Sequence, residues 1–249
     1  MTGIALLSQI PLRKEPTHTS EMTSQLLFGE TFSVEKQVDN WLKIKVKHDG
    51  YEGFLNVNQF EELQCDEIPD IPTKSLLTEI VDLQRNQKML LSAGSLITSI
   101  HDNVFSIGSA RYEVLHSTPV GFYDFHNITD VASMFLNIPY LWGGRTVMGM
   151  DCSGYSQLVY RLCGINIPRD ASQQVECGST LNFLQETMPG DLAFFGDDEK
   201  ITHVGIMVDN SHVIHCSGCV RKDKIDNQGI FDGRKYTHTL RVIKRIIKL

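Results

Sequence analysis

The sequence predicts an α+β protein in which small β units precede a domain made of one main helix and an antiparallel sheet. Three observations predict it. Residues 4–63 contain short strand-like runs that are separated by turn residues. Residues 152–163 have apolar positions at helical spacing, and four more apolar, strand-like runs follow them. A helix that leads into an antiparallel sheet is typical of the α+β class.

The composition is that of a globular chain. It has 249 residues, of which 41% are hydrophobic and 21% are charged, and this length leaves room for one to three domains with a sizeable core. The net charge of −7 comes from 23 basic and 30 acidic residues that are spread along the chain. This distribution argues against a basic surface that binds the phosphate backbone of a nucleic acid, so we expect no nucleic-acid partner.

The start of the chain predicts neither a membrane span nor a secretion signal. No apolar run approaches the roughly 20 residues that a membrane-spanning helix needs. Residues 1–7 also lack a basic leader and a long apolar stretch. We therefore expect a cytoplasmic protein with no membrane span, although a chain from which a signal had been removed would look the same.

Six cysteines are too few and too unevenly placed for a disulfide scaffold in a chain this long, so a reducing compartment suits them. Cys216 and Cys219 form a C-x-x-C pair, but no second C-x-x-C and no H-x-x-x-H follows. Zinc is thus the weaker interpretation, and we expect no metal and no other cofactor. Cys65, Cys163 and Cys177 are interpreted as unreactive thiols.

The first predicted domain, residues 1–64, has the rhythm of a small antiparallel barrel. Residues 41–46 alternate apolar and polar, and Asp49-Gly50 supplies a hairpin turn directly after them. A Pro-containing connector, residues 66–72, leads to a second, degenerate β unit at residues 73–122. The strand-like runs of the second unit are residues 90–91, 95–100 and 104–107.

The third predicted domain, residues 126–249, begins with a helix over residues 128–136. The apolar face of a second helix, which Gly164 is placed to end, is formed by Tyr155, Leu158, Val159, Leu162 and Cys163. The strand-like runs that follow are residues 192–195, 203–208, 212–215 and 240–247, the second and third joined as a hairpin by residues 209–211.

Cys152 stands at the start of the second helix, directly after Asp151. Its sulfur would face the unpaired N–H groups and the positive end of the helix dipole, which stabilise thiolate over thiol, so we expect a low thiol pKa. Ser153 and Gly154 keep the helix start uncrowded, and the N–H of Cys152 is a candidate oxyanion donor. A free cysteine at a helix start is still more often a small buried hydrophobe, so this residue alone decides nothing.

Two histidines supply the rest of the predicted reactive set. His203 begins a predicted strand and shares a face with Gly205, a small residue that leaves space beside it. Imidazole suits proton transfer near neutral pH, and His215, at the end of the paired strand, would hold the ring and tautomer of His203. Histidines at strand ends are usually structural or solvent-facing, and His212 and His238 are interpreted in that way.

These residues resemble the NlpC family of papain-like bacterial cell-wall peptidases over roughly residues 126–249. The matching motifs, in chain order, are Tyr140-Leu141-Trp142-Gly143-Gly144, Asp151-Cys152-Ser153-Gly154, Ile167-Pro168-Arg169-Asp170 followed by Gln173, Pro189-Gly190-Asp191-Leu192, Thr202-His203-Val204-Gly205-Ile206 and His215-Cys216-Ser217-Gly218. The front of the chain is similar to bacterial SH3 modules, residues 1–64 clearly and residues 73–122 only loosely. The resemblance implies a papain-like domain, with the helix bearing Cys152 packed on an antiparallel sheet, preceded by two small SH3-like β-barrels.

The activity that the resemblance implies is that of a cysteine peptidase. It would cut the bond between γ-D-glutamyl and an L-diamino acid, diaminopimelate or lysine, in peptidoglycan peptides. By family role, Cys152 is the nucleophile, His203 the general base and acid, and His215 the orienting third member. Tyr140 would line the site and assist the oxyanion, and Asp151 and Ser153 would contact the substrate.

Two SH3 modules ahead of the catalytic domain look most like the subset that trims free muropeptides, the γ-D-glutamyl-L-diamino acid endopeptidases or dipeptidyl-peptidases VI. That subset recognises an N-terminal L-Ala-γ-D-Glu through an acidic residue that holds the free amine. Asp170 is the first candidate for this contact and Glu52 the second. Ala171 stands where a serine is expected, so one substrate hydrogen bond is either missing or supplied by Ser172. Such a site would reject intact wall, whose stem peptides have no free amine, and fits recycling of imported fragments.

Two other functions remain open at this point. One is a secreted wall-lytic endopeptidase that uses its SH3 modules as wall anchors. The other is a non-enzymatic module, in which SH3 barrels hold a peptide and the papain-like domain is vestigial; it predicts an unreactive Cys152. The complete set of Cys152, His203 and His215 argues against the second alternative. Substrate choice rests on the resemblance alone, because a fold does not fix a function.

Overall fold

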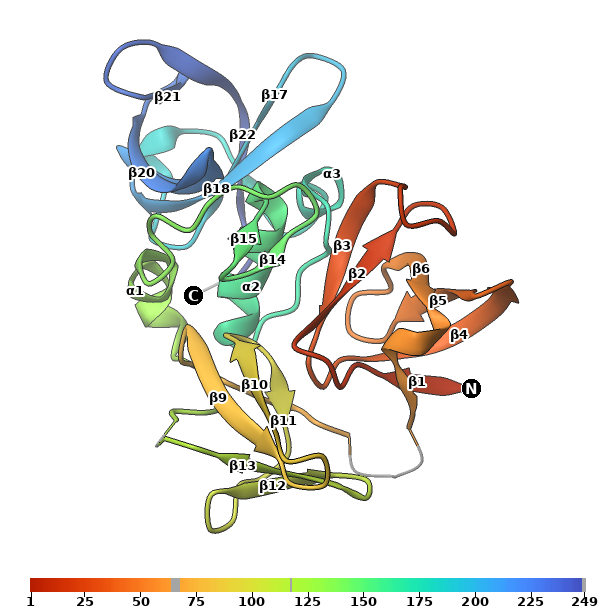
Figure 1. The fold of residues 1–249 in the computed structure, drawn as a ribbon. Helices are drawn as coiled ribbons and strands as arrows, with labels where there is room; N and C mark the ends of the chain where they lie inside the picture. Colours follow the sequence, from red (N-terminus) through yellow and green to blue (C-terminus); the bar gives the residue numbers. More distant parts are fainter. Residues whose placement is uncertain (64–67, 117, 248–249) are drawn as a thin grey trace. The chain divides into compact units, whose positions relative to one another are not determined.

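The computed structural model describes residues 1–63, 68–116 and 118–247, and Cys65 lies outside these residues. The chain divides into two compact units (Figure 1). Unit 1 consists of Met1–Phe122 and Trp142–Val147, and unit 2 consists of Tyr123–Leu141 and Met148–Leu249. The predicted boundaries of three domains therefore stay predictions, since the contacts group the first two predicted domains in one unit.

Most of the first barrel in unit 1 is one antiparallel sheet in the order β3-β2-β6-β5-β4-β1-β7. Leu42, Ile44 and Val46 of β5 are buried in its core, as the alternation predicts, and Gly50 makes the following turn with φ +73°. The elements are β1 (Thr2–Ile4), β2 (Gln9–Arg13), β3 (Met22–Leu27), β4 (Thr31–Val38), β5 (Trp41–Val46), β6 (Glu52–Asn56), the 3-10 helix η1 (Val57–Gln59) and β7 (Glu61–Glu62).

The second β region of unit 1 forms a four-stranded sheet, β10-β9-β13-β12, and a separate β8-β11 pair. Its strands are β8 (Ile71–Pro72), β9 (Leu77–Asp82), β10 (Gln87–Ser92), β11 (Leu96–Ile97), β12 (Val104–Ile107) and β13 (Ala110–Val114). Phe28, from the first barrel, packs edge-on against Phe105 and Tyr112, with ring centroids 6.2 and 5.3 Å apart. The two β regions thus share one apolar core.

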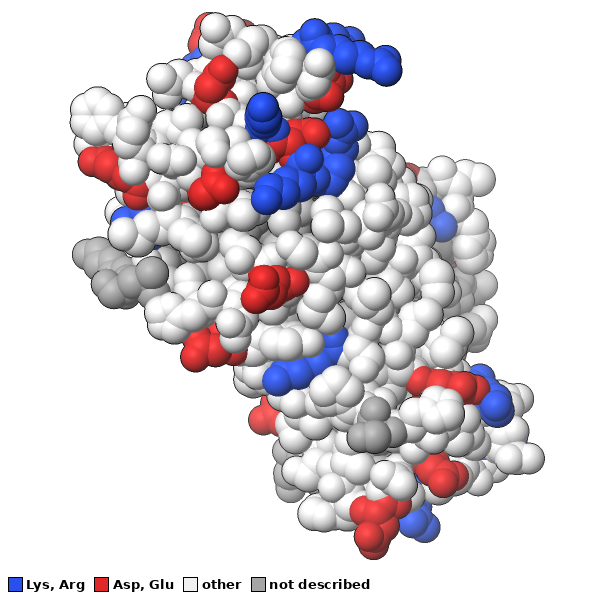
Figure 2. Space-filling view, turned by 90° about the vertical axis from the view of Figure 1, so that its left-hand side faces the viewer, with Lys and Arg blue, Asp and Glu red and all other residues white. Residues whose placement is uncertain are grey.

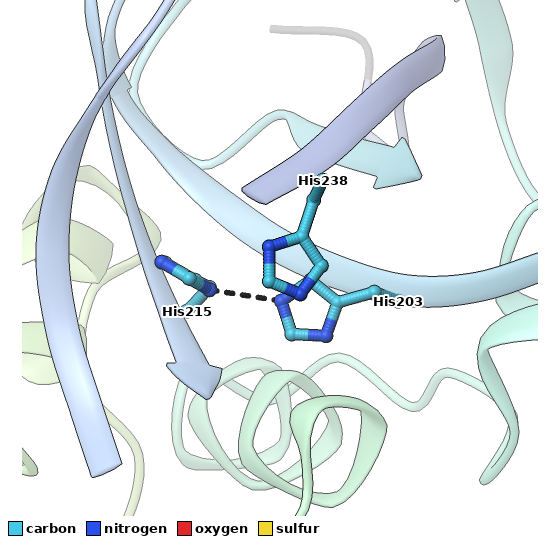
Figure 3. A group of neighbouring side chains, drawn as sticks. All are labelled: His203, His215 and His238. Carbon is cyan, nitrogen blue, oxygen red and sulfur yellow. Dashed lines mark hydrogen bonds between the residues drawn. The ribbon is translucent and has the colours of Figure 1, made fainter. Parts of the chain in front are cut away.

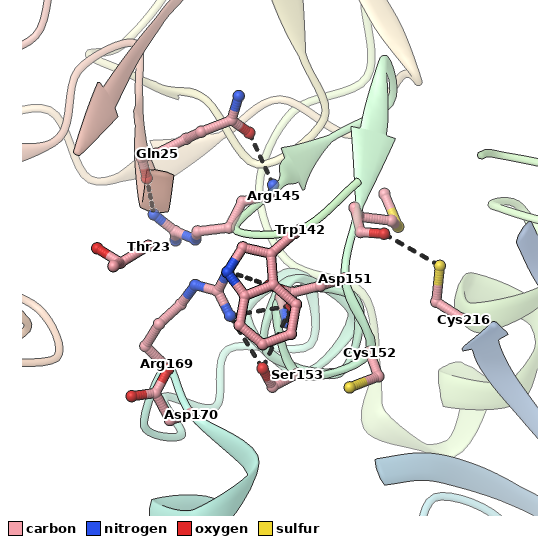
Figure 4. Close-up of polar contacts among 12 residues, drawn as sticks. Thr23, Gln25, Trp142, Arg145, Asp151, Cys152, Ser153, Arg169, Asp170 and Cys216 are labelled. Atoms are coloured by element: carbon pink, nitrogen blue, oxygen red, sulfur yellow. Dashed lines mark hydrogen bonds and ion pairs between the residues drawn. The ribbon is translucent and has the colours of Figure 1, made fainter. Parts of the chain in front are cut away.

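A short segment from the middle of the chain, Trp142–Val147, packs with unit 1 and contains β14 (Arg145–Thr146). The Arg145 side chain is only 2% exposed, and its two terminal nitrogens each lie 3.0 Å from a carboxylate oxygen of Glu30. The backbone N–H of Arg145 also donates to Gln25 over 2.8 Å (Figure 4). Because either charge would be costly to bury alone, the pair anchors the segment.

Unit 2 contains a closed barrel of six antiparallel strands in the order β22-β17-β18-β19-β20-β21, because β21 also pairs with β22; β16 extends the sheet at β22 (Figure 1). Phe195, Met207 and Ile230 belong to its apolar core. The strands are β15 (Gly149–Met150), β16 (Ser179–Leu181), β17 (Leu192–Gly196), β18 (Ile201–Asp209), β19 (His212–Ser217), β20 (Cys219–Ile225), β21 (Gly229–Phe231) and β22 (Tyr236–Arg245).

The main helix of unit 2, α2 (Cys152–Leu162), is buried along its whole length and contacts β18 and β19. It ends as predicted at Gly164, which has φ +78°. The N–H groups of Gly164 and Ile165 donate to carbonyls of the last turn, as in a Schellman motif. The other helices are η2 (Phe125–Asn127), α1 (Ile128–Ser133), α3 (Ala171–Gln174) and η3 (Leu184–Glu186), so α1 is three residues shorter than predicted.

Acidic and basic side chains are scattered among uncharged ones on the face that Figure 2 shows. Several charged residues are paired, among them Arg221 with Asp223 and Arg245 with Asp191, each over 2.7 Å. Within the described part of the chain, no helix has the length and apolar character needed to cross a membrane.

Candidate active site

Cys152 is the first residue of α2, as the sequence predicts, and the structure shows that Asp151 is the N-cap of this helix. The Asp151 carboxylate accepts a hydrogen bond of 2.7 Å from the N–H of Gly154, which fixes where the helix begins. The N–H of Cys152 lies in the first turn, where backbone donors have no intrahelical acceptor. It is therefore placed to serve as an oxyanion donor.

The thiol of Cys152 is buried, with 7% of the residue exposed. Burial, and next to it the charge of Asp151, raises its pKa to about 12, although the backbone N–H groups of Val204 and Ser153 and the charge of Arg169 act in the opposite direction. The predicted low thiol pKa is thus wrong, because desolvation outweighs the helix terminus. At neutral pH the residue rests as a thiol and needs a base to become a nucleophile.

Arg169 forms hydrogen bonds with two residues at the start of α2. Its side chain, 1% exposed, donates to both carboxylate oxygens of Asp151, over 3.0 and 2.6 Å, and to Oγ of Ser153 over 2.9 Å (Figure 4). Gln174 adds a hydrogen bond to the carbonyl of Ser153. Asp151 and Ser153 therefore brace the helix start, and their predicted contact with substrate stays a prediction. The sequence motif contained Arg169, but only the fold reveals what it pairs with.

His203 and His215 meet across neighbouring strands, β18 and β19. Nε2 of His203 lies 2.8 Å from Nδ1 of His215 (Figure 3). Gly205 pairs with His215, and a Cβ at position 205 would lie 2.9 Å from the Cβ of His215. The absence of a side chain at Gly205 thus leaves room for His215, and the predicted space beside His203 itself stays a prediction.

Asp223, on β20, extends this pair to a third group that the sequence did not reveal. Its Oδ2 atom lies 3.0 Å from Nε2 of His215 and 2.7 Å from Nε of Arg221. Strand β20 pairs with β19, but the register that brings Asp223 to the histidine is a property of the folded sheet. The result is a hydrogen-bonded chain from His203 through His215 to a carboxylate.

This chain fixes which nitrogen of each ring holds a proton. Burial lowers the pKa of His203 well below its usual value, with the neighbouring His215 as the second cause, and burial lowers the pKa of His215 to about 4. Both rings are therefore neutral at pH 7. A carboxylate only accepts, so His215 is protonated on Nε2 and accepts at Nδ1 from Nε2–H of His203. Nδ1 of His203 is left with a lone pair, as a general base requires.

Within unit 2, the sulfur of Cys152 reaches the strand that bears this base. The residue after His203, Val204, donates its backbone N–H to the sulfur. Tyr140 adds a phenol to the site: its backbone N–H donates to Gly218, and burial raises its pKa to about 12, with Cys152 as the second cause. The Tyr140 hydroxyl is therefore protonated at neutral pH and able to donate, and its predicted role in the site stays a prediction.

His238, interpreted from the sequence as structural or solvent-facing, lies in the site. Its ring stacks on that of His203, with centroids 4.2 Å apart and planes at 24° (Figure 3). It comes from β22, which joins the barrel after an irregular register at Phe195, so sequence spacing gave no signal for it. His238 and His212 are both half-buried, but His212 bonds Asp209 at the hairpin turn.

The three imidazoles each offer a nitrogen within 4.8 Å of the others, a grouping that metal sites also show. Two features fit proton transfer better. The two nitrogens of His203 and His215 that lie 2.8 Å apart share a proton, whereas two ligands of one tetrahedral zinc ion lie about 3.4 Å apart. The stacked rings of His203 and His238 also direct their lone pairs along nearly parallel planes rather than toward one point.

The contacts of the remaining predicted substrate-binding residues do not indicate whether they bind substrate. Asp170 is the N-cap of α3, and its N–H donates weakly to Gln173 over 3.4 Å. Ser172 is exposed on that helix. Glu52 is an exposed residue of unit 1 whose carboxylate pairs with Lys43 over 2.7 Å. Their roles stay predictions.

Three of the other described cysteines have structural surroundings. Cys216 is buried and donates to the carbonyl of Met150 (Figure 4), and burial raises the pKa of its thiol. Cys163 is buried at the end of α2, and Cys177 lies near the carbonyl of Gln173. Nothing in these contacts singles out a second nucleophile.

A cysteine at the start of a helix and, on the strand that its sulfur reaches, a histidine that is oriented by further polar groups are the residue types that a cysteine peptidase needs in its active site. Comparison with known proteins agrees. A model of the NlpC/P60 family matches residues 137–240, and a model described as the bacterial dipeptidyl-peptidase Sh3 domain matches residues 12–60. The chain belongs to the NlpC/P60 family, and it is a cysteine peptidase with an N-terminal SH3 domain.

Three similar proteins illustrate the relationship. The probable endopeptidase NlpC of Escherichia coli K12 is 34% identical over 105 residues, 40% of this chain and 68% of that protein. The gamma-D-glutamyl-L-lysine dipeptidyl-peptidase of Bacillus cereus is 23% identical over 238 residues, 84% of this chain and 71% of that protein. A solved structure of an NlpC/P60 family protein from Bacillus cereus covers 100% of both chains with a TM-score of 0.83 and 18% identity, which shows the fold alone.

Proposed function

We propose that this chain hydrolyses the γ-D-glutamyl–L-diamino acid bond of free muropeptides and releases L-Ala-γ-D-Glu. The observation that carries the proposal is the hydrogen-bonded chain of His203, His215 and Asp223, which starts on the residue next to Val204, whose backbone N–H meets the buried thiol of Cys152. The names of the relatives support the choice of bond, since one of them is a gamma-D-glutamyl-L-lysine dipeptidyl-peptidase. The match of residues 12–60 to a dipeptidyl-peptidase SH3 domain supports it further.

The reaction starts from a neutral thiol and a neutral imidazole. Cys152 passes its proton to Nδ1 of His203 while its sulfur attacks the γ-carbonyl carbon of the D-glutamyl residue. The N–H of Cys152 and the hydroxyl of Tyr140 stabilise the oxyanion. When the C–N bond breaks, His203 returns the proton to the leaving amine and a thioester remains. Water, deprotonated by His203, then cleaves the thioester, and the thiol is restored.

Selection of free muropeptides requires an acidic group for the substrate's N-terminal amine. Asp170 is our first candidate and Glu52 the second, with Ser172 as an additional hydrogen-bond donor. A carboxylate that loses its water when the substrate binds is stabilised by the ammonium group of a free N-terminus. When that amine is blocked, the carboxylate has no counter-ion and binding is weakened. A function of this kind suits the recycling of wall fragments inside the cell.

The test is product analysis by mass spectrometry on L-Ala-γ-D-Glu-L-Lys and its diaminopimelate counterpart, each beside an N-acetylated copy. We expect release of L-Ala-γ-D-Glu from the free peptides and a loss of about 100-fold on acetylation, the effect of leaving one buried charge unpaired. Cys152→Ala should abolish release without unfolding the protein. Full activity of that variant would refute the proposal, and faster lysis of sacculi than of free peptide would favour a wall-lytic enzyme instead.

A further inference from the structure

Unit 2 contains a pocket of about 280 Å³ beside the catalytic histidine. Its lining includes Tyr140, Ser217 and Gly218, of which the first and last are joined by a backbone hydrogen bond. It also includes Thr202 and the stacked pair His203 and His238. Among the described residues, His203 lines this pocket and Cys152 does not.

The chemistry of the proposed reaction assigns a half of the substrate to the side of His203. The acyl half stays on the sulfur of Cys152 until water releases it. The amine half must receive its proton from Nδ1 of His203, so it has to lie beside this ring when the C–N bond breaks. A pocket that His203 lines, and Cys152 does not, is therefore placed for the leaving amine.

The side chains of the lining restrict what the pocket can bind. They offer hydroxyl groups, imidazole nitrogens and the thiol of Cys216, and no Lys, Arg, Asp or Glu is among the described residues that line it. A charged group that lost its water there would have no counter-ion, which costs several kcal/mol. The pocket thus suits the backbone and aliphatic part of an amino acid, while a charged end stays in water.

His238 offers the lining a hydrogen-bonding group of its own. Its Nδ1 is engaged by Oγ1 of Thr237 over 2.9 Å, so Nε2 is the ring nitrogen left to meet a ligand. The stacking on His203 places this second ring next to the group that protonates the amine. A residue in that place contacts the leaving half without taking part in proton transfer.

We propose that this pocket is the subsite for the L-diamino acid on the amine side of the cleaved bond, and that His238 contacts this residue through Nε2. The inference rests on the proposed function and deepens it. Because the charged end of the diamino acid remains in water, lysine and diaminopimelate are accepted with similar efficiency. The subsite is therefore selective for an amino-acid leaving group and tolerant of its charged end.

The test compares two substrates that give the same acid product, L-Ala-γ-D-Glu-L-Lys and the γ-methyl ester of L-Ala-D-Glu, whose leaving group is only methanol. His238→Phe keeps a ring on His203 and removes Nε2. We expect kcat/KM for the tripeptide to fall about tenfold, the value of one hydrogen bond, and that for the ester to change less than twofold. His126→Phe, an exposed position of η2, is the matched control and should affect neither substrate.

The outcomes separate the two proposals. If the wild-type protein cleaves the ester but neither tripeptide, the proposed function fails; if His238→Phe slows both substrates equally, or neither, the subsite assignment fails. If His238→Phe does not fold, Thr202→Phe replaces it in the test, because a phenylalanine at this exposed lining position fills the pocket without altering His238. It should likewise lower kcat/KM for the tripeptide and leave that for the ester nearly unchanged. A preference above 100-fold for lysine or for diaminopimelate would show that the charged end is bound, and would overturn the assignment.

Discussion

The Nε2 atom of His215 lies 3.0 Å from Oδ2 of Asp223, and this contact determines the tautomer of two imidazoles at once. The carboxylate draws the proton of His215 to Nε2, which leaves Nδ1 to accept from His203. The lone pair that a general base needs therefore appears on Nδ1 of His203. Asp223 touches neither the thiol nor the amide to be cleaved, so it acts as a positioning residue.

Replacement of Asp223 tests this relationship. Asp223→Ala frees His215 to take either tautomer, and we expect kcat/KM to fall by 10- to 100-fold, as is typical when a group that orients a reactive histidine is lost. Asp223→Asn still accepts through its amide oxygen and should retain more activity than the alanine variant. The ¹⁵N chemical shifts of the rings report the tautomers directly. Unchanged shifts in Asp223→Ala would contradict the positioning role.

The pH dependence of the reaction follows from the shifted pKa values. His203 must be unprotonated to accept the thiol proton, and burial lowers its pKa below the usual value of 6.5. Activity should thus be lost only as the pH falls below 6.5, rather than at neutral pH. Alkylation of Cys152 by iodoacetamide should keep accelerating above pH 9, because the thiol pKa is raised to about 12. A plateau of alkylation near pH 7 would mean a resting thiolate.

Arg169 is expected to matter for both stability and reactivity. Arg169→Met leaves the Asp151 carboxylate without its buried cation, directly beside Cys152. We expect the free energy of unfolding to drop by about 3–5 kcal/mol and the thiol pKa to rise further, since the unpaired negative charge disfavours the thiolate. Urea unfolding and the alkylation rate measure the two effects. Adding Asp151→Asn, which removes that charge, should recover part of the loss; no recovery would contradict the pairing argument.

Gly205 is a third residue whose replacement should impair the site. In Gly205→Ala the new Cβ would lie 2.6 Å from Cγ2 of Val213 and 2.9 Å from Cβ of His215. Overpacking of this kind destabilises a protein by about 1–3 kcal/mol, and the displaced His215 should lower kcat/KM more than tenfold. Adding Val213→Ala relieves the first contact and not the second. Stability should therefore recover in the double variant while activity does not, which thermal unfolding and peptide cleavage can check.

The parts of the site that the sequence predicted correctly are those set by local rules. The helix start at Cys152 and the glycine that ends the helix follow from the spacing of apolar residues and from the preference of helix ends for glycine. The hairpin that joins β18 and β19 brings His203 and His215 together because neighbouring strands pair. Motif and topology were sufficient for these residues.

The parts that the sequence missed depend on contacts between distant segments. Asp223 reaches the site through the register of a third strand, and His238 through a strand that enters the barrel with an irregular register. The thiol pKa was predicted in the wrong direction because it depends on burial, which spacing along a helix does not reveal. The segment Trp142–Val147 lies with unit 1 because of the buried pair of Arg145 and Glu30, 115 positions apart.

That buried pair also bears on how such enzymes can be recombined. A chimera that took residues 1–122 from a relative would set a foreign barrel against Arg145, and the guanidinium would keep a partner only if that barrel carried a carboxylate in the place of Glu30. Modular exchange therefore has to transplant two pieces of sequence, the front of the chain and the six residues of Trp142–Val147, even though the second piece is inserted just ahead of the nucleophile.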